Sequence, residues 1–184
     1  MNQKSPWKIK SSQVVYANPW IKVNEHQVIN PAGNDGIYTV VEFQNIAIAI
    51  LPIDQDGYTY LVGQYRFSLN SYEWEIPEGG CPLGTEPLAT AQRELQEECG
   101  LLAQHYECIL HMQLSNSVSN EISYSYIATQ LTHTNAEPEE TEQLQIKKLH
   151  FRDLYQMVME GEIKDALSVA TILKTAMLYP AYLK

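Results

Sequence analysis

The chain has 184 residues, 45% of them hydrophobic, which is enough for one well-buried core and too few for two large domains. Its formal net charge of −10 argues against binding of polymeric DNA or RNA, because such binding needs a broad basic surface. The sequence contains neither a signal-peptide-like run near its start nor an apolar stretch of membrane-spanning length, so it predicts a cytoplasmic protein without a membrane partner.

The N-terminal part of the chain is predicted to be β-structure. Residues 7–16 and 20–29 have the composition of paired strands, and the turn-rich segment 31–36 follows them. We expect residues 1–36 to form a small antiparallel appendage and residues 37–184 to form the main domain.

The next segments are also rich in strand-forming residues. Residues 37–43 and 46–53 are β-branched runs, and the turn sequence Asp-Gln-Asp-Gly at 54–57 leads into a further strand at 58–67. The strands on either side of this turn are predicted to form a central hairpin.

A helix is predicted between Thr85 and Gly100. Thr85 is a suitable N-cap, and Pro87 falls in the first turn, where a missing N–H costs little. Gly100 follows the last turn as a C-terminal stop. Ala91 and Leu95 can supply the buried side of this helix.

Three glutamates, Glu94, Glu97 and Glu98, fall on one side of this helix near its C-terminal end. Like charges at these spacings destabilise a helix by roughly a few tenths of a kcal/mol each, and the macrodipole disfavours anions at this end. Arg93, the only basic residue of the helix, cannot neutralise all three. A solvated acidic face is the ordinary alternative. The whole pattern instead favours a bound divalent cation, Mg²⁺ or in its place Mn²⁺, because hard cations prefer carboxylate oxygens.

The C-terminal half mixes strands and helices. Strands are predicted at 106–113, 122–130 and 144–151, and helices at 154–160 and 166–178. The sum is an α/β fold with a mixed β-sheet and helices on its faces, an α/β/α sandwich with the small N-terminal sheet added.

Residues 79–101 have a spacing pattern of their own: Gly79, five residues, Thr85, seven residues, and then Arg-Glu-Leu-Gln-Glu-Glu-Cys-Gly-Leu. This pattern resembles the box of the Nudix hydrolases, G-x5-E-x7-R-E-U-x-E-E-x-G-U, where U is aliphatic. Every fixed position matches except Thr85, which replaces the first glutamate, and the neighbouring Glu86 is a candidate substitute. The resemblance implies the α/β/α sandwich fold deduced above.

The resemblance also implies roles for individual residues. In the Nudix family the box glutamates, here Glu94, Glu97 and Glu98, bind the metal, and Arg93 would orient them by ion pairing. The residue before the first box glycine offers its backbone carbonyl to a metal, and by position this is Glu78.

Arg66 belongs to a second, shorter element. The segment Gln64-Tyr65-Arg66 resembles the Q-x-R element of ADP-ribose pyrophosphatases, whose arginine helps to hold the diphosphate. Arginine suits this task because its planar fork can donate two parallel bonds to phosphate oxygens. The structural alternative is an ion pair with Glu73 or Glu75 across strands.

Further acidic residues are candidates by resemblance. ADP-ribose pyrophosphatase-like enzymes place an additional catalytic glutamate in a loop close before a strand, where Glu142 is the best match and Glu140 the next. Composition alone describes this region as a solvated acidic loop. Glu121 resembles a position that helps to bind substrate or metal.

The function implied is Mg²⁺-dependent hydrolysis of the diphosphate linkage in a nucleoside diphosphate joined to another group. ADP-ribose, cleaved to AMP and ribose 5-phosphate, and nucleotide sugars are the expected small-molecule substrates. Glu142, or else Glu97 or Glu98, is expected to deprotonate the attacking water. Related enzymes commonly form a homodimer through their N-terminal strands, so a homodimer is expected. The alternative is a nucleotide-sensing module that binds without turnover, which the replacement at Thr85 favours.

Overall fold

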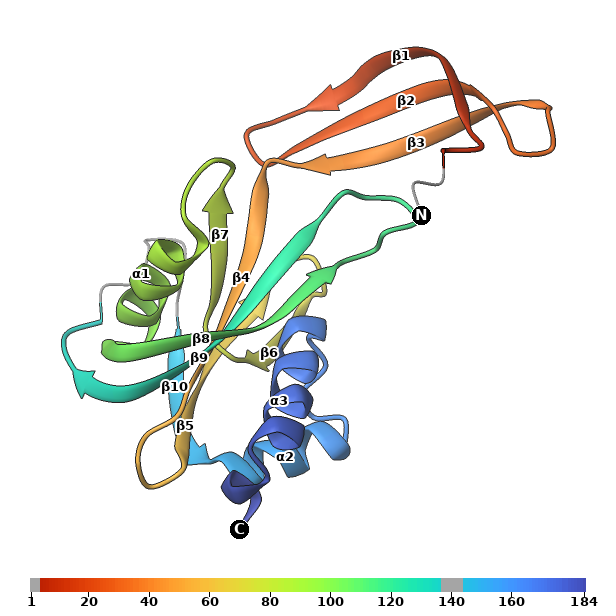
Figure 1. Ribbon diagram of the computed structural model, residues 1–184. Coiled ribbons are helices and arrows are strands. Elements are labelled where there is room, and N and C mark those ends of the chain that lie inside the picture. The colour runs from red at the N-terminus through yellow and green to blue at the C-terminus, as the bar shows by residue number, and fades with distance from the viewer. Residues whose placement is uncertain (1–3, 137–143) are drawn as a thin grey trace. The chain divides into compact units, whose positions relative to one another are not determined.

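The computed structural model describes residues 4–136 and 144–184 (Figure 1). The chain divides into two compact units. The first comprises Met1–Asn45 and Gln113–Ile122, and the second comprises Ile46–Met112 and Ser123–Lys184. None of the helices within the described ranges has the length and apolar character needed to cross a membrane.

The first unit is built on an antiparallel sheet in the order β1-β2-β3. Its strands are β1 (Lys8–Ala17), β2 (Ile21–Ile29) and β3 (Asp35–Phe43). The turn between β2 and β3 is closed by Asn30, whose side-chain oxygen accepts bonds from the N–H groups of Ala32 and Asn34, both at 3.0 Å. Asn120 joins the segment 113–122 to this sheet, because its side chain accepts a bond of 2.8 Å from the N–H of Phe43.

The second unit contains two sheets. One has the order β7-β4-β9-β8 and the other the order β10-β5-β6. The strands of the first sheet are β4 (Asn45–Pro52), β7 (Glu78–Pro82), β8 (Leu101–Gln113) and β9 (Ile122–His133). The strands of the second are β5 (Tyr58–Arg66), β6 (Ser71–Glu75) and β10 (Gln145–His150).

The predicted hairpin of β4 and β5 is wrong, although the turn between them is present. The side chain of Asp54 closes the turn by accepting bonds from the N–H groups of Asp56 and Tyr58. Beyond the isolated bridge of Ile53 with Thr59, the two strands enter different sheets. β4 pairs in parallel with β9 instead, with Ala47 opposite Ser123. A strand that is buried on both faces is typical of such a central position.

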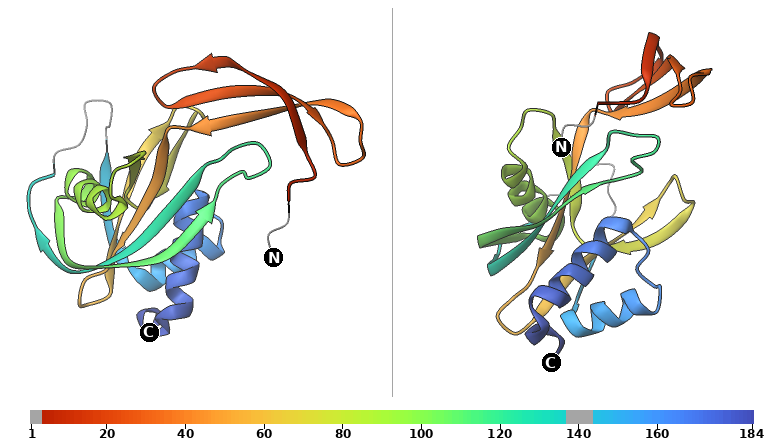
Figure 2. Two further views of the ribbon diagram at one scale, coloured as in Figure 1. Left: turned by 45° about the horizontal axis from the view of Figure 1, so that its top comes forward. Right: turned by 45° about the vertical axis from the view of Figure 1, so that its right-hand side comes forward.

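Helices cover both faces of the sheets. These helices are α1 (Pro87–Cys99), α2 (Phe151–Met159) and α3 (Ala166–Leu178), and the 3-10 helix η1 (Pro180–Leu183) follows. Figures 1 and 2 show α1 on one side of the sheets and the α2–α3 pair on the other. Ile48 and Ile50 of β4 pack with Ala91 and Leu95 of α1 in the core. The α/β/α sandwich predicted from the sequence is therefore confirmed.

The ends of α1 and α3 are set by local chemistry. The N-cap of α1 is Glu86 and not Thr85, because Pro87 occupies the first helical position. Gly100 ends α1 in the left-handed conformation, with φ 61°, as predicted. Asp165 is the N-cap of α3, and its side chain accepts a bond of 2.7 Å from the N–H of Ser168.

Candidate active site

Two of the three α1 glutamates are buried. Glu94 is 9% exposed and Glu98 is 2% exposed, and they share the buried side of the helix with Ala91 and Leu95. The side chain of Glu97 is partly exposed, at 29%. Because buried carboxylates are costly unless other groups compensate their charge, a merely solvated acidic face does not describe this helix.

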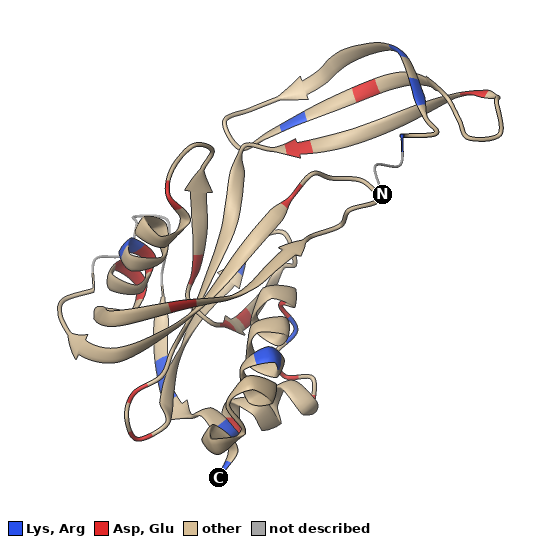
Figure 3. Ribbon diagram, in the orientation of Figure 1, with Lys and Arg blue, Asp and Glu red and all other residues tan. Residues whose placement is uncertain are grey.

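Arg93 joins two of these glutamates. Its Nη2 lies 2.6 Å from Oε1 of Glu94, and its Nη1 lies 2.5 Å from Oε2 of Glu97. Partial burial disfavours the charged form of Arg93 and acts to lower the pKa of the guanidinium. The negative charges of Glu94 and Glu97 outweigh this effect, so the pKa is raised. Acidic and basic positions of α1 accordingly lie next to one another in Figure 3. Arg93 thus fixes the orientation of two glutamates by ion pairing.

Strand β7 lies directly against the α1 glutamates. The N–H of Glu78 donates a bond of 2.9 Å to Oε2 of Glu98. A Cβ added at Gly79 would lie only 1.9 Å from Oε1 of Glu94. The glycine at the start of the box is therefore explained by the close approach of Glu94 to the β7 backbone.

The side chain of Glu78 is directed toward α3. Its Oε1 accepts a bond of 3.1 Å from the hydroxyl of Ser168. Burial, followed by the negative charge of Asp165, raises the pKa of Glu78 well above its usual range. Neither Asp165 nor Ser168 is among the site residues predicted from the sequence, because both lie far from Glu78 along the chain.

Arg66 is paired with Glu75, one of the two partners anticipated from sequence. Its Nε lies 3.0 Å from both carboxylate oxygens, and its Nη2 also bonds to Oε2. The hydrogen bonds that Arg66 donates to Glu75 raise the pKa of the guanidinium against the effect of burial. The Arg66 side chain nevertheless remains 37% exposed, so part of the guanidinium stays accessible.

A cavity of about 400 Å³ adjoins Arg66. It is lined by Arg66, Ser68, Leu69, Glu73, Glu75, Lys164, Asp165 and Ala166. Glu73, the other anticipated partner of Arg66, lies 3.7 Å from Lys164 instead. Asp165 belongs to this cavity and also acts electrostatically on Glu78, so the Arg66 cavity and the α1–β7 carboxylates are neighbours within one unit.

Three other glutamates were predicted as site residues from the sequence. Glu121 belongs to the first unit, lines a cavity of about 370 Å³ there, and has its pKa raised by burial. Glu140 and Glu142 lie outside the described residues. The roles given to these three glutamates stay predictions.

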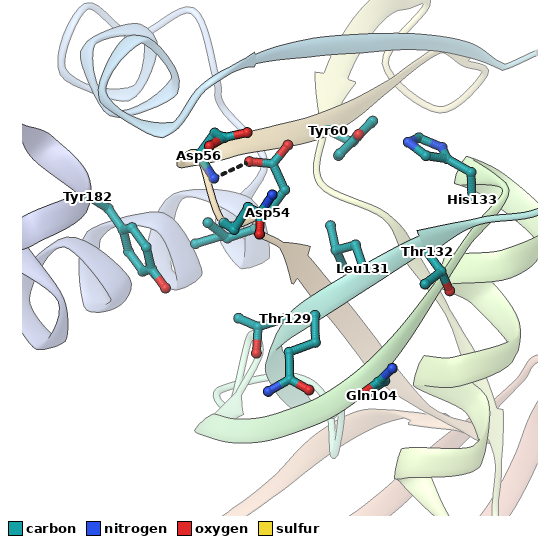
Figure 4. A pocket seen from close by; sticks show the side chains of 12 residues that line it. Asp54, Asp56, Tyr60, Gln104, Thr129, Leu131, Thr132, His133 and Tyr182 are labelled. Atoms are coloured by element: carbon teal, nitrogen blue, oxygen red, sulfur yellow. Dashed lines mark hydrogen bonds between the residues drawn. The ribbon is translucent and has the colours of Figure 1, made fainter.

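A larger cavity, of about 540 Å³, lies elsewhere in the second unit (Figure 4). Tyr60, His133 and Tyr182 contribute rings to its lining, and Asp54 and Asp56 contribute carboxylates. Of the predicted site residues that the structure describes, none lines it. The buried carboxylates and the accessible Arg66, rather than cavity volume, therefore define the candidate site.

The donor atoms on α1 and β7 suit a hard divalent cation. Glu94, Glu97 and Glu98 offer carboxylate oxygens, and Glu78 offers a backbone carbonyl on the adjoining strand. Within residues 4–136 and 144–184, no three His, Cys, Asp or Glu side chains converge into a preformed cage. This combination fits Mg²⁺, which is usually bound by one or two carboxylates with waters and substrate phosphates completing its shell.

Comparison with family models identifies the family of this chain. A model described as the NUDIX domain matches residues 43–168. This chain belongs to the Nudix family. A second model, described as the nucleoside diphosphate sugar hydrolase N-terminal domain, matches residues 7–41. Nudix hydrolases generally depend on a divalent metal, in agreement with the oxygen donors of α1 and β7.

Two relatives and one solved structure are similar to this Nudix chain over two thirds or more of its length. The ADP-ribose pyrophosphatase of Mycobacterium tuberculosis (strain ATCC 25618 / H37Rv) is 28% identical over 166 residues, covering 89% of this chain and 80% of the relative. The ADP-ribose pyrophosphatase of Bacillus subtilis (strain 168) is 30% identical over 128 residues, covering 68% of this chain and 69% of the relative. A crystal structure of an ADP compounds hydrolase matches with a TM-score of 0.86 at 19% identity and covers 98% of each chain, which supports the fold.

Proposed function

We propose that this Nudix hydrolase cleaves the diphosphate linkage of a nucleoside diphosphate joined to another group. The observation that carries the proposal is the pair of buried carboxylates, Glu94 and Glu98, on a helix with the Nudix box spacing. ADP-ribose is the first candidate substrate, with AMP and ribose 5-phosphate as products, because two relatives are named ADP-ribose pyrophosphatases. Nucleotide sugars are the second, supported by the N-terminal family model.

In this proposal Glu94, Glu97, Glu98 and the carbonyl of Glu78 would hold Mg²⁺, or Mn²⁺ in its place. A bound cation of this kind neutralises phosphate oxygens and lowers the pKa of a coordinated water. Arg93 keeps Glu94 and Glu97 in place through its two ion pairs. These residues would therefore hold the cation that supplies this chemistry.

Arg66 would bind the diphosphate of the substrate. Glu75 holds its Nε edge, while the exposed part of the guanidinium lines the adjoining cavity and can donate to phosphate oxygens. Fixing one edge of the side chain reduces the entropy lost when the other edge binds. The pairing with Glu75 thus supports a positioned, substrate-binding arginine.

Glu142 is proposed as the general base, with Glu97 and Glu98 as the alternatives. A base must lie within one hydrogen bond of the water that it deprotonates, and Glu97 and Glu98 would lie beside a water bound to a cation on α1. Glu121 and Glu140 are proposed to contact substrate.

We also propose a homodimer and a cytoplasmic location. The free thiols of Cys81, Cys99 and Cys108 support a reducing compartment.

The substrate class is tested with a panel of ADP-ribose, dinucleoside diphosphates and nucleotide sugars, incubated with the purified chain and Mg²⁺ and analysed by chromatography. We expect ADP-ribose to yield AMP and ribose 5-phosphate. Binding of these compounds without cleavage of any of them would favour the nucleotide-sensing alternative.

Substitution of Glu98 by Gln tests the metal site. It keeps the size of the side chain and its acceptor for the Glu78 N–H but removes the charge. We expect kcat to fall by about 10²–10³-fold, the loss typical when one electrostatic stabiliser is removed, with an unchanged circular dichroism spectrum. The matched control is Glu160→Gln, an exposed position at the end of α2, which should leave kcat unchanged. Near-normal turnover by Glu98→Gln would remove Glu98 from the site.

A further inference from the structure

Ser168 occupies a distinctive place in the first turn of α3. Its side chain is fully buried, and its hydroxyl accepts a bond of 3.0 Å from the N–H of Ile76 while donating one of 3.1 Å to Oε1 of Glu78. Its own N–H is bonded to the capping residue Asp165. One hydroxyl therefore uses both its acceptor and its donor on a single three-residue segment, 76–78.

The segment 76–78 is held from two opposite helical layers. On the α1 side, the N–H of Glu78 donates to Glu98. On the α3 side, Ser168 binds Ile76 and the Glu78 side chain. Between them, the carbonyl of Pro77 accepts a bond of 2.8 Å from the N–H of Ile50 in β4. The backbone that leads into β7 is thus fixed at three successive residues.

We propose that Ser168 is a positioning residue for metal binding, an inference that rests on the function proposed above. Ser168 fixes Ile76 and the Glu78 side chain, and in this way it positions the backbone of Glu78. The N–H of that residue bonds to Glu98, and its carbonyl would bind the cation. Ser168 touches neither substrate nor metal in this account. Outer partners of this kind typically change metal affinity by about 10–100-fold when they are removed.

A purely structural role for Ser168 makes a different prediction. If the role is purely structural, removing the hydroxyl leaves the Ile76 N–H without its partner and lowers stability. Metal affinity would then stay unchanged. Thr175, two turns along the same helix, provides the matched control, because it is also fully buried and its hydroxyl bonds to the carbonyl of Thr171. Thr175→Val removes a buried hydroxyl that has no bond to the segment 76–78.

The test measures Mn²⁺ binding in the presence of ADP by electron paramagnetic resonance, which reports free Mn²⁺ directly, together with thermal unfolding of each variant. Ser168→Ala is expected to weaken Mn²⁺ binding by about 10–100-fold. Ser168→Cys, which keeps most of the volume but donates only weakly, should also weaken it. Thr175→Val should keep the affinity of the original chain while also losing thermal stability.

Two results overturn the inference. One is an affinity for Mn²⁺ within twofold of the original in both Ser168 variants, and the other is an equal loss of affinity in Thr175→Val. Failure of the proposed function is seen separately, because the unmodified chain would then neither take up Mn²⁺ nor cleave any compound of the substrate panel.

Discussion

At the scale of single residues, the chemistry of the site depends on close contacts around Glu94. Arg93 holds this carboxylate from one side, and the backbone at Gly79 approaches it from the other. The sequence was sufficient to place the three box glutamates and Arg93 on one helix. It was not sufficient to identify Ser168, because the partner of its hydroxyl, Glu78, is 90 positions away along the chain.

Gly79→Ala is predicted to reduce activity strongly. The added methyl group would collide with the Glu94 carboxylate and displace it from its bond with Arg93. We expect kcat to fall by at least about tenfold and stability to fall by about 1–3 kcal/mol, the usual cost of overpacking. Steady-state kinetics and urea unfolding measure the two effects.

The control for Gly79→Ala is Gly36→Ala in β3, another strand glycine. There the nearest atom to an added Cβ is Cγ2 of Val28, at 4.0 Å, so the change should be tolerated. Retention of full activity by Gly79→Ala would contradict the placement of Glu94 against β7.

At the scale of secondary-structure elements, local signals predicted most boundaries and the pairing of β1 with β2, but not the pairing of β4. The turn at residues 54–57 is present, yet β4 pairs with β9, whose partner residues lie more than 70 positions along the chain. β7 was not predicted, because Gly79, Gly80 and Pro82 are poor strand formers. Contacts with Glu94 and Glu98 of α1 explain why this segment is nevertheless extended beside the helix.

The C-terminal end of α1 gives a prediction at this scale. Gly100→Ala should destabilise the protein by more than about 1 kcal/mol, because a left-handed residue with a Cβ is strained and the added atom would lie 2.9 Å from the N of Ala136 and the O of Thr134. Thermal or urea unfolding measures the loss. Gly161→Ala is the control for strain without collision, since its φ is 76° and the space around it is open. Equal losses in the two variants would show that the collision contributes nothing.

At the scale of the whole molecule, the first compact unit leaves several large apolar side chains exposed. In the first unit Trp7, Ile9 and Trp20 are 40%, 64% and 65% exposed. Exposed aromatic and aliphatic groups of this kind are typical of surfaces that bind another protein. They support the proposed homodimer, for which no sequence signal beyond the family resemblance was available.

The dimer is predicted to have twice the mass of the 21.0 kDa chain in sedimentation at micromolar concentration. Trp20→Arg, which places a charge among the exposed apolar groups, should shift the protein toward the monomer. Gln27→Arg adds the same charge at an exposed position of β2 and is the control. A monomeric mass for the unmodified chain would rule out the proposed assembly.

We propose that the buried glutamates of α1 hold a divalent cation with which the chain opens a diphosphate bond. Phosphorus NMR of ADP-ribose with the purified chain, first with Mg²⁺ and then with excess chelator, tests this dependence on the cation. We expect the diphosphate signals to be replaced by those of AMP and ribose 5-phosphate with Mg²⁺, and to persist with chelator. Cleavage at the same rate under both conditions would show that the reaction needs no divalent cation.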